Sequence, residues 1–328
     1  MDKTKDVALV LSSGGPRGFA YIGAIEELER RGYHITSVAG SSIGSLVGGI
    51  YAAGRLHEFK EWLFNLSNWQ IMKLLDVSMG RNYLLKGTKV INAIKTVVPE
   101  VMIEDLEIPY VAVATDLYTG EPHEFRSGPL FDAIRASISI PSMFKPVENG
   151  YHTFIDGGLV STFPLGRVTR NGHDLLVGFD VNTTDEKEID EFLQLVHRQE
   201  EETSERRRSI LERIGSESTL LDKVKAISDE GESWIQGFKE GLEEKKKLDD
   251  SAPVEKDNDY VSLLSRSFAI ANHTIAKLET QMYKPDILVT MSMDSYGAMS
   301  FSDYTKGEEI SERGRALMAD ALDRYESQ

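Results

Sequence analysis

The sequence predicts an α/β fold built on a parallel sheet, and three observations lead to this prediction. A short apolar segment, residues 6–11, passes through a glycine-rich turn into a segment with apolar residues at helical spacing. A second strand around residues 37–39 repeats the pattern of strand, turn and helix, which is typical of right-handed parallel α/β folds. The third observation is residues 185–258, whose dense charge interrupts this pattern and predicts an insertion.

The remaining elements follow in chain order. The first helix carries Phe19, Ile22, Ile25 and Leu28 at helical spacing and ends at Gly32. Further strands are predicted at 109–117, 123–127, 175–181 and 286–291, and further helices at 88–98 and 129–138. The segment 306–325 is amphipathic and predicts a last helix.

We expect one domain over residues 1–328, with a core formed by 1–184 and 259–328 and a charged, mainly helical insertion at 185–258. The insertion contains 22 acidic and 13 basic side chains, so it supplies −9 of the net charge of −16. Two interpretations stay open: a segment used in self-association to a homo-oligomer, or a solvated surface segment.

Composition excludes several kinds of function. Without cysteine the chain can form neither disulfides nor thiolate zinc sites, and it has no cysteine nucleophile. The net charge of −16 argues against nucleic acid as a partner and against broad adhesion to anionic membranes, but leaves peripheral membrane contact through an apolar patch open. No apolar segment approaches the ~20 residues of a membrane span, and no signal peptide is evident, so we expect a cytoplasmic protein.

The segment Gly40-Ser41-Ser42-Ile43-Gly44 matches the pattern G-x-S-x-G between a strand and a helix. In such a sharp turn the flanking glycines let neighbouring backbone pass, so that Ser42 points outward as a nucleophile. The N–H of Ile43 can then donate to a developing oxyanion. The alternative is a serine that merely caps a helix.

Two further motifs could supply the other groups that a serine nucleophile needs, namely backbone N–H groups and a carboxylate. The loop SSGGPRG, residues 12–18, follows the first strand, and Gly14 and Gly15 can converge their N–H groups on negative charge. A tight turn or a nucleotide cradle are the alternatives, although no nucleotide fingerprint is present. Asp156 precedes Gly157 and Gly158 at a predicted strand end, where an ordinary turn is the alternative. No histidine lies where a triad needs it, because His273 falls in a predicted helix, so a Ser-Asp dyad fits better.

Together these motifs resemble the patatin-like phospholipases. The loop Gly14-Gly15-Pro16-Arg17-Gly18, the elbow from Gly40 to Gly44 and Asp156-Gly157-Gly158 occur in that family's order and spacing. The resemblance covers roughly 1–183 and 259–328, and implies a three-layer α/β/α fold with a largely parallel sheet. This chain departs from the family pattern in having Ser12-Ser13 ahead of the loop.

The resemblance also implies roles for single residues. Ser42 is the expected nucleophile and Asp156 its general base, with Gly14 and Gly15 supplying oxyanion-hole amides. For Arg17 the family suggests that it orients the loop or approaches a phosphate, and a surface salt bridge is the alternative. Partial burial should raise the pKa of Asp156 toward the working pH.

The expected function is a serine lipid acyl hydrolase that needs no cofactor and no metal, with a lipid or acyl-ester substrate. The alternatives are a serine hydrolase of soluble esters or thioesters, and a patatin-like interaction module that has lost activity. An apolar cluster follows the elbow helix, and we interpret it as core packing, with an acyl pocket or a lipid-contact lid as alternatives. Its members are Trp62, Phe64, Leu66, Trp69, Ile71, Met72, Leu74 and Leu75.

Overall fold

The computed structural model describes residues 5–74, 83–184, 260–297 and 302–328. The predicted insertion at 185–258, and with it the proposed route to self-association, lies outside the described residues. The described residues before and after it belong to one compact unit. Among the helices described, none combines the length and the apolar content that crossing a bilayer requires.

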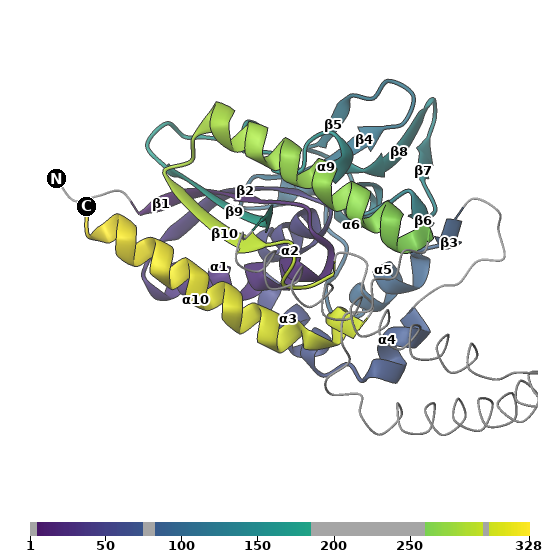
Figure 1. The fold of residues 1–328 in the computed structure, drawn as a ribbon, viewed down its shortest axis with the longest axis horizontal. Coiled ribbons are helices and arrows are strands. Elements are labelled where there is room, and N and C mark those ends of the chain that lie inside the picture. The colour runs from purple at the N-terminus through teal and green to yellow at the C-terminus, as the bar shows by residue number, and fades with distance from the viewer. Residues whose placement is uncertain (1–4, 75–82, 185–259, 298–301) are drawn as a thin grey trace, which may run out of the picture. The chain divides into compact units, whose positions relative to one another are not determined.

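In the described part of the chain, eight strands form one sheet in the order β10-β9-β1-β2-β4-β8-β7, with β5 also paired to β4 (Figure 1). The five adjacent strands β10, β9, β1, β2 and β4 run parallel. Strands β5 and β8 pair antiparallel with β4, and β7 pairs antiparallel with β8. The prediction of a largely parallel sheet is therefore confirmed. The strands are β1 (Asp6–Leu11), β2 (His34–Ser41), β4 (Tyr110–Asp116), β5 (Pro122–Phe125), β7 (Val147–Asn149), β8 (His152–Asp156), β9 (Leu175–Thr183) and β10 (Ile287–Ser292). Two short strands, β3 (Tyr83–Leu85) and β6 (Ser142–Phe144), pair with each other.

Helices cover both faces of the sheet, as the three-layer prediction requires (Figure 1). One face is packed by α1 (Ala20–Arg30), α2 (Ile43–Ala52) and α10 (Gly307–Glu326), and the other by α9 (Tyr260–Tyr283). Shorter helices are α3 (Leu56–Phe64), α4 (Asn68–Leu74), α5 (Thr88–Ile94) and α6 (Leu130–Ser137). Single 3₁₀ turns occur at Gly15–Phe19, Ile103–Asp105, Gly157–Leu159 and Ser302–Lys306.

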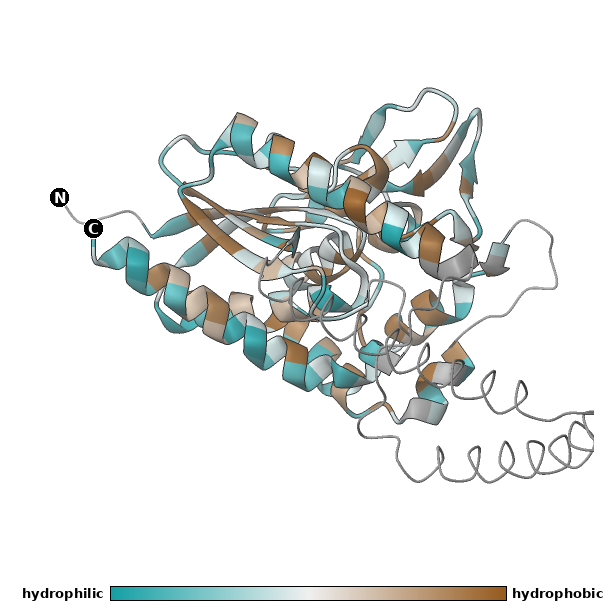
Figure 2. Cartoon of the chain, in the orientation of Figure 1, coloured by the Kyte–Doolittle hydropathy of each residue, from teal (hydrophilic) through white to brown (hydrophobic). Residues whose placement is uncertain are grey.

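The alternation of β1 explains the three layers. Val7, Leu9 and Leu11 point into the larger core with α1, α2 and α10, while Ala8 and Val10 face the smaller core that includes Ala276 of α9. A strand that is buried on both faces is apolar over most of its length, and Figure 2 shows hydrophobic residues in the central strands.

Candidate active site

The predicted site motifs meet at the carboxyl edge of the parallel strands. From β1 the sheet continues to β2 on one side and to β9 on the other. In open α/β sheets such a switch point leaves a crevice at the strand ends, and ligands bind there. The glycine-rich loop leaves β1 at this edge, and the elbow leaves β2 beside it.

Ser42 lies on a strained turn between β2 and α2. Its backbone has φ 52° and ψ −122°, a conformation that costs an L-residue free energy and is typical of a nucleophile elbow. The two flanking glycines are required by close backbone contacts. A Cβ on Gly44 would lie 2.2 Å from the carbonyl oxygen of Leu11, and one on Gly40 would lie 2.3 Å from Gly44 itself.

The Ser42 hydroxyl donates a hydrogen bond of 2.5 Å to Oδ2 of Asp156. Both side chains are buried, and the second carboxylate oxygen of Asp156 accepts from the N–H of Gly158 at 2.8 Å. Burial raises the pKa of Asp156 to about 6, because neither hydrogen bond brings a positive charge to offset the desolvation. The carboxylate therefore has the basicity that accepting a hydroxyl proton near neutral pH demands.

Strand β4 fixes both members of this pair. The N–H of Ser42 donates to the hydroxyl of Ser137 at 2.9 Å, and that hydroxyl donates to the carbonyl of Val113 on β4 at 2.6 Å. On the other side, the Thr115 hydroxyl of β4 donates to the carbonyl of Asp156 at 2.8 Å. Ser137 and Thr115 were not predicted as site residues. A serine at a helix end and a threonine in a strand carry no local signal that they hold Ser42 and Asp156 in place.

Gly14 and Gly15 line the same hollow as Ser42 and Asp156. Gly15 has φ 60°, which favours glycine. Within the described chain, the N–H groups of these two residues donate to no other group. The hollow measures about 40 Å³, room for a few water molecules, and α9 closes one side of it through Ser265, Phe268, Ala269 and Asn272.

Arg17 is not the surface residue that a salt bridge would require, because its side chain is 1% exposed. Its guanidinium donates to the carbonyls of Met293 at 2.7 Å and Tyr296 at 3.0 Å, and to Oδ1 of Asn182 at 3.2 Å. The salt-bridge interpretation is therefore wrong. Burial lowers the pKa of Arg17 to about 10, and its contacts tie the glycine-rich loop to β9 and to the segment after β10.

Histidines take structural positions in the described chain. His273 contacts the carbonyl of Asn182 at 2.8 Å, and His152 lies 2.5 Å from Asp116 Oδ2 at the antiparallel end of the sheet. Among the residues described, no histidine hydrogen-bonds to Ser42, and no cluster of three potential metal ligands occurs. His197 lies outside the described residues.

A second hollow of about 130 Å³ meets the first at Ser42, Gly15 and Ile140. Apart from Ser42, Gly15 and Tyr304, the residues that line it are apolar: Phe19, Ile43, Leu46, Phe59, Trp62, Leu63, Leu66, Ile71, Leu74, Val90, Ile94, Ile138, Ile140, Met143 and Phe144. We call this hollow the apolar chamber. Four members of the predicted apolar cluster line it, Trp62, Leu66, Ile71 and Leu74, while Trp62 and Phe64 also pack against the main core. The side chains of Met72 and Leu75 lie outside those described.

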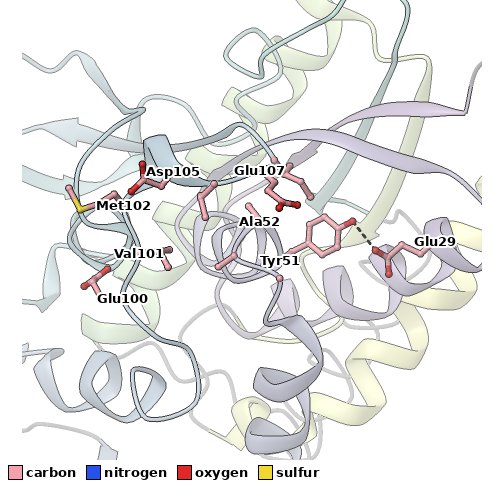
Figure 3. Close-up of a pocket in the computed structure, with 12 residues that line it drawn as sticks. Glu29, Tyr51, Ala52, Glu100, Val101, Met102, Asp105 and Glu107 are labelled. Atoms are coloured by element: carbon pink, nitrogen blue, oxygen red, sulfur yellow. Dashed lines mark hydrogen bonds between the residues drawn. The ribbon is translucent and has the colours of Figure 1, made fainter.

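A larger hollow of about 820 Å³ lies where α2 ends, at the opposite edge of the sheet (Figure 3). Glu29, Glu100, Asp105 and Glu107 line it, and the Tyr51 hydroxyl donates to Glu29 at 2.8 Å. Among the described residues that line it there is no serine, histidine or lysine, and none of the sequence motifs reaches it. Size alone therefore does not identify the reactive site of this molecule.

Known proteins are similar to this chain in sequence. A family model described as patatin-like phospholipase matches residues 9–168. An NTE family protein of Mycobacterium bovis is 33% identical over 338 residues, which cover 98% of this chain and 92% of that protein. A patatin-like phospholipase domain-containing protein of Caenorhabditis elegans is 34% identical over 192 residues, 56% of this chain and 14% of that protein. Patatin-like phospholipase domain-containing protein 6 of mouse is 29% identical over 191 residues, again 14% of its length.

Proposed function

Because this chain belongs to the patatin-like phospholipase family, we propose that it is a serine acyl hydrolase of lipid esters that works through Ser42 and Asp156. The observation that carries the proposal is the buried hydrogen bond of 2.5 Å between these two side chains on a strained elbow. A module that had lost its activity would have no need to maintain this strain and this buried carboxylate.

In the proposed reaction, Oγ of Ser42 attacks the ester carbonyl while its proton passes to Asp156. The tetrahedral intermediate collapses as the protonated Asp156 gives that proton to the departing alkoxide. Water then enters, loses a proton to Asp156 and attacks the acyl-enzyme. As the second tetrahedral intermediate collapses, the protonated Asp156 returns the proton to Oγ of Ser42, and the carboxylic acid is released. Asp156 thus accepts and returns one proton in each half-reaction.

The negative charge on the carbonyl oxygen needs donors in both intermediates. The N–H groups of Gly14 and Gly15, with that of Ile43 at the first turn of α2, are our candidates. Gly14 and Gly15 line the Ser42 hollow, and Ile43 lies beside Ser42 in the chamber wall. A single well-placed donor contributes about 2.7–4 kcal/mol to such a transition state.

The apolar chamber is the proposed site for the acyl chain, because it opens on the nucleophile and its wall is almost wholly hydrocarbon. Its volume of about 130 Å³ is comparable to the ~150 Å³ cavities that hold one benzene ring. An acyl chain of about six carbons fits that space. This size favours a second candidate substrate class as well, soluble esters of short fatty acids.

We further propose that α9 makes peripheral contact with a lipid surface. Its outer face exposes Leu263, Ile270, Leu278 and Met282, each more than half exposed and spaced to lie along one side. The exposed charged residues beside them are Lys277 and Arg266, the latter paired with Asp294 at 2.5 Å, whereas Glu279 faces inward. An apolar stripe with cations, in a chain of net charge −16, fits a phospholipid surface. The inner face of the same helix borders the Ser42 hollow.

A fluorophosphonate probe and a series of short-chain acyl esters test the proposed function. Wild-type protein should be labelled and should turn the esters over, while Ser42→Ala should do neither. As a matched control, Ser45→Ala removes a neighbouring serine whose hydroxyl donates to the carbonyl of Ser42, and labelling should persist. Folded wild-type protein that neither labels nor hydrolyses any ester would refute the proposal.

A further inference from the structure

A buried polar network lies directly behind the glycine-rich loop, and Asn182 is at its centre. Asn182 is near the end of β9 and wholly buried. Its amide nitrogen donates to the carbonyl of Ser13 at 2.7 Å and to Oδ1 of Asp180 at 3.0 Å. Its amide oxygen accepts from Arg17 at 3.2 Å. Because acceptors face the amide nitrogen and a guanidinium faces the amide oxygen, the side-chain amide of Asn182 can adopt only one of its two flipped orientations.

The contact to Ser13 bears on catalysis through peptide geometry. The carbonyl of Ser13 and the N–H of Gly14 belong to the same peptide unit, and in a planar trans peptide they point in opposite directions. A donor that holds the Ser13 carbonyl on the buried side therefore turns the Gly14 N–H toward the other side. On that side Gly14 lines the hollow with Ser42 and Asp156.

We propose that Asn182 is a positioning residue that sets the direction of the Gly14 N–H, an inference that rests on the oxyanion role proposed above for Gly14. Asn182 touches neither Ser42 nor the Ser42 hollow, so it acts only through the loop.

The surroundings of Asn182 hold it in place for this task. Its own N–H donates to Asp180 at 2.9 Å, and its carbonyl accepts from His273 of α9 at 2.8 Å. The Ser12 hydroxyl adds a weaker contact to the Ser13 carbonyl at 3.0 Å. The departure Ser12-Ser13 thus adds a second donor, the Ser12 hydroxyl, to the carbonyl that Asn182 holds.

The first test replaces the donor. Asn182→Ala should lower kcat on a short-chain ester about 10- to 100-fold, while KM changes less than about threefold, since the oxyanion forms only in the transition state. The rate of fluorophosphonate labelling should fall with kcat. Thr183→Val is the matched control, because it removes a hydrogen bond of 2.9 Å from the same strand end to Met291 without touching the loop. Its kcat should stay within about twofold of wild type.

A second variant and a second readout separate this inference from the proposed function. Asn182→Asp keeps the shape but replaces the donor with an acceptor, so the ¹H–¹⁵N signals of Gly14 and Gly15 should shift in the glycine-labelled protein. Those signals report the loop whether or not the enzyme turns over. A wild-type protein without activity, combined with shifted glycine signals in Asn182→Asp, would refute the proposed function but would leave the role of Asn182 in holding the loop intact. Wild-type kcat and unshifted glycine signals in folded Asn182→Ala and Asn182→Asp would overturn the role of Asn182.

Discussion

Oγ of Ser42 lies 2.5 Å from Oδ2 of Asp156, although 114 residues separate the two in the chain. The pair is buried, and the carboxylate receives its two hydrogen bonds from neutral donors, Ser42 and the N–H of Gly158. Since no cation hydrogen-bonds to Asp156, desolvation dominates and the pKa of its carboxyl rises.

The pH dependence of turnover should report this rise. Below a pH of about 6 the carboxyl is protonated and cannot accept the Ser42 proton, so kcat/KM on a neutral ester should climb with pH and level off above it. The ester should have no group that titrates in this range, so that the profile reports the titration of the enzyme alone. A profile that is flat down to the usual Asp pKa of 3.8 would remove Asp156 as the base.

Asp156→Asn should be inactive yet more stable than wild type at neutral pH. The folded-state pKa lies above the unfolded value of 3.8, so the folded state is favoured when the carboxyl is neutral and loses that advantage as pH rises through about 6. Ionised and buried, Asp156 then costs about 3 kcal/mol, which asparagine avoids. Urea unfolding at neutral pH should show the gain, and the gain should shrink near pH 4. An equal gain at both pH values would contradict this account.

Ser42→Gly and Ser42→Ala should both lose activity but differ in stability. The φ of 52° at this position strains any residue with a Cβ, and glycine relieves the strain at a smaller entropic cost. We expect Ser42→Gly to exceed Ser42→Ala by about 1–2 kcal/mol in the free energy of unfolding. Thermal and urea denaturation of the two variants, measured side by side, would compare their free energies of unfolding. Equal stabilities would mean that the elbow stores no strain.

Acyl-chain preference should follow the volume of the apolar chamber. Trp62→Ala enlarges the chamber, so the ratio of kcat/KM for an octanoyl ester to that for a butanoyl ester should rise about 10-fold. Val90→Phe fills the chamber and should move the ratio the opposite way. Tyr151→Ala, which truncates a fully exposed aromatic side chain between β7 and β8, serves as the matched control. An unchanged ratio in both chamber variants would place the acyl chain elsewhere.

Vesicle binding should depend on the outer face of α9. Replacing Ile270 and Leu278 together with glutamine removes exposed apolar surface, so binding to phosphatidylcholine vesicles with a minor fraction of phosphatidylglycerol should weaken about 10-fold. Turnover of a soluble short-chain ester should stay at the wild-type level, because both side chains point away from the Ser42 hollow. Tyr118→Gln removes an equally exposed apolar side chain from the β4–β5 turn and should bind as wild type does. Unaltered vesicle binding in the double variant would rule out this face.

Much of the sheet could be predicted from sequence because its strands are short apolar runs that end in turns. The segment 6–11 coincides with β1, and 109–117 and 175–181 lie within two residues of β4 and β9. The strands β3, β6 and β7 were missed, since three-residue strands carry too little periodicity.

The site shows where local patterns stop being informative. The motifs singled out Ser42 and Asp156, but nothing near either residue predicts that Ser137 and Thr115 tie them to β4. Arg17 is buried because backbone carbonyls from 293 and 296 reach it, a contact that no sequence window contains. Trp62 lines a chamber as well as packing against the main core, and apolar periodicity cannot predict that a chamber is left open there.

Because the backbone N–H of Ser42 and the backbone carbonyl of Asp156 are both tied to β4, the proposed catalytic pair forms only late in folding. Ser42 follows β2, a parallel neighbour of β4, and Asp156 ends β8, an antiparallel neighbour, so the pair is complete only when both strands flank β4. Closing a contact over 114 residues carries an entropic cost that only the finished sheet offsets. If the proposed function holds, a nascent or partly unfolded chain should have no hydrolase activity, and recovery of esterase activity during refolding should coincide with the docking of β8.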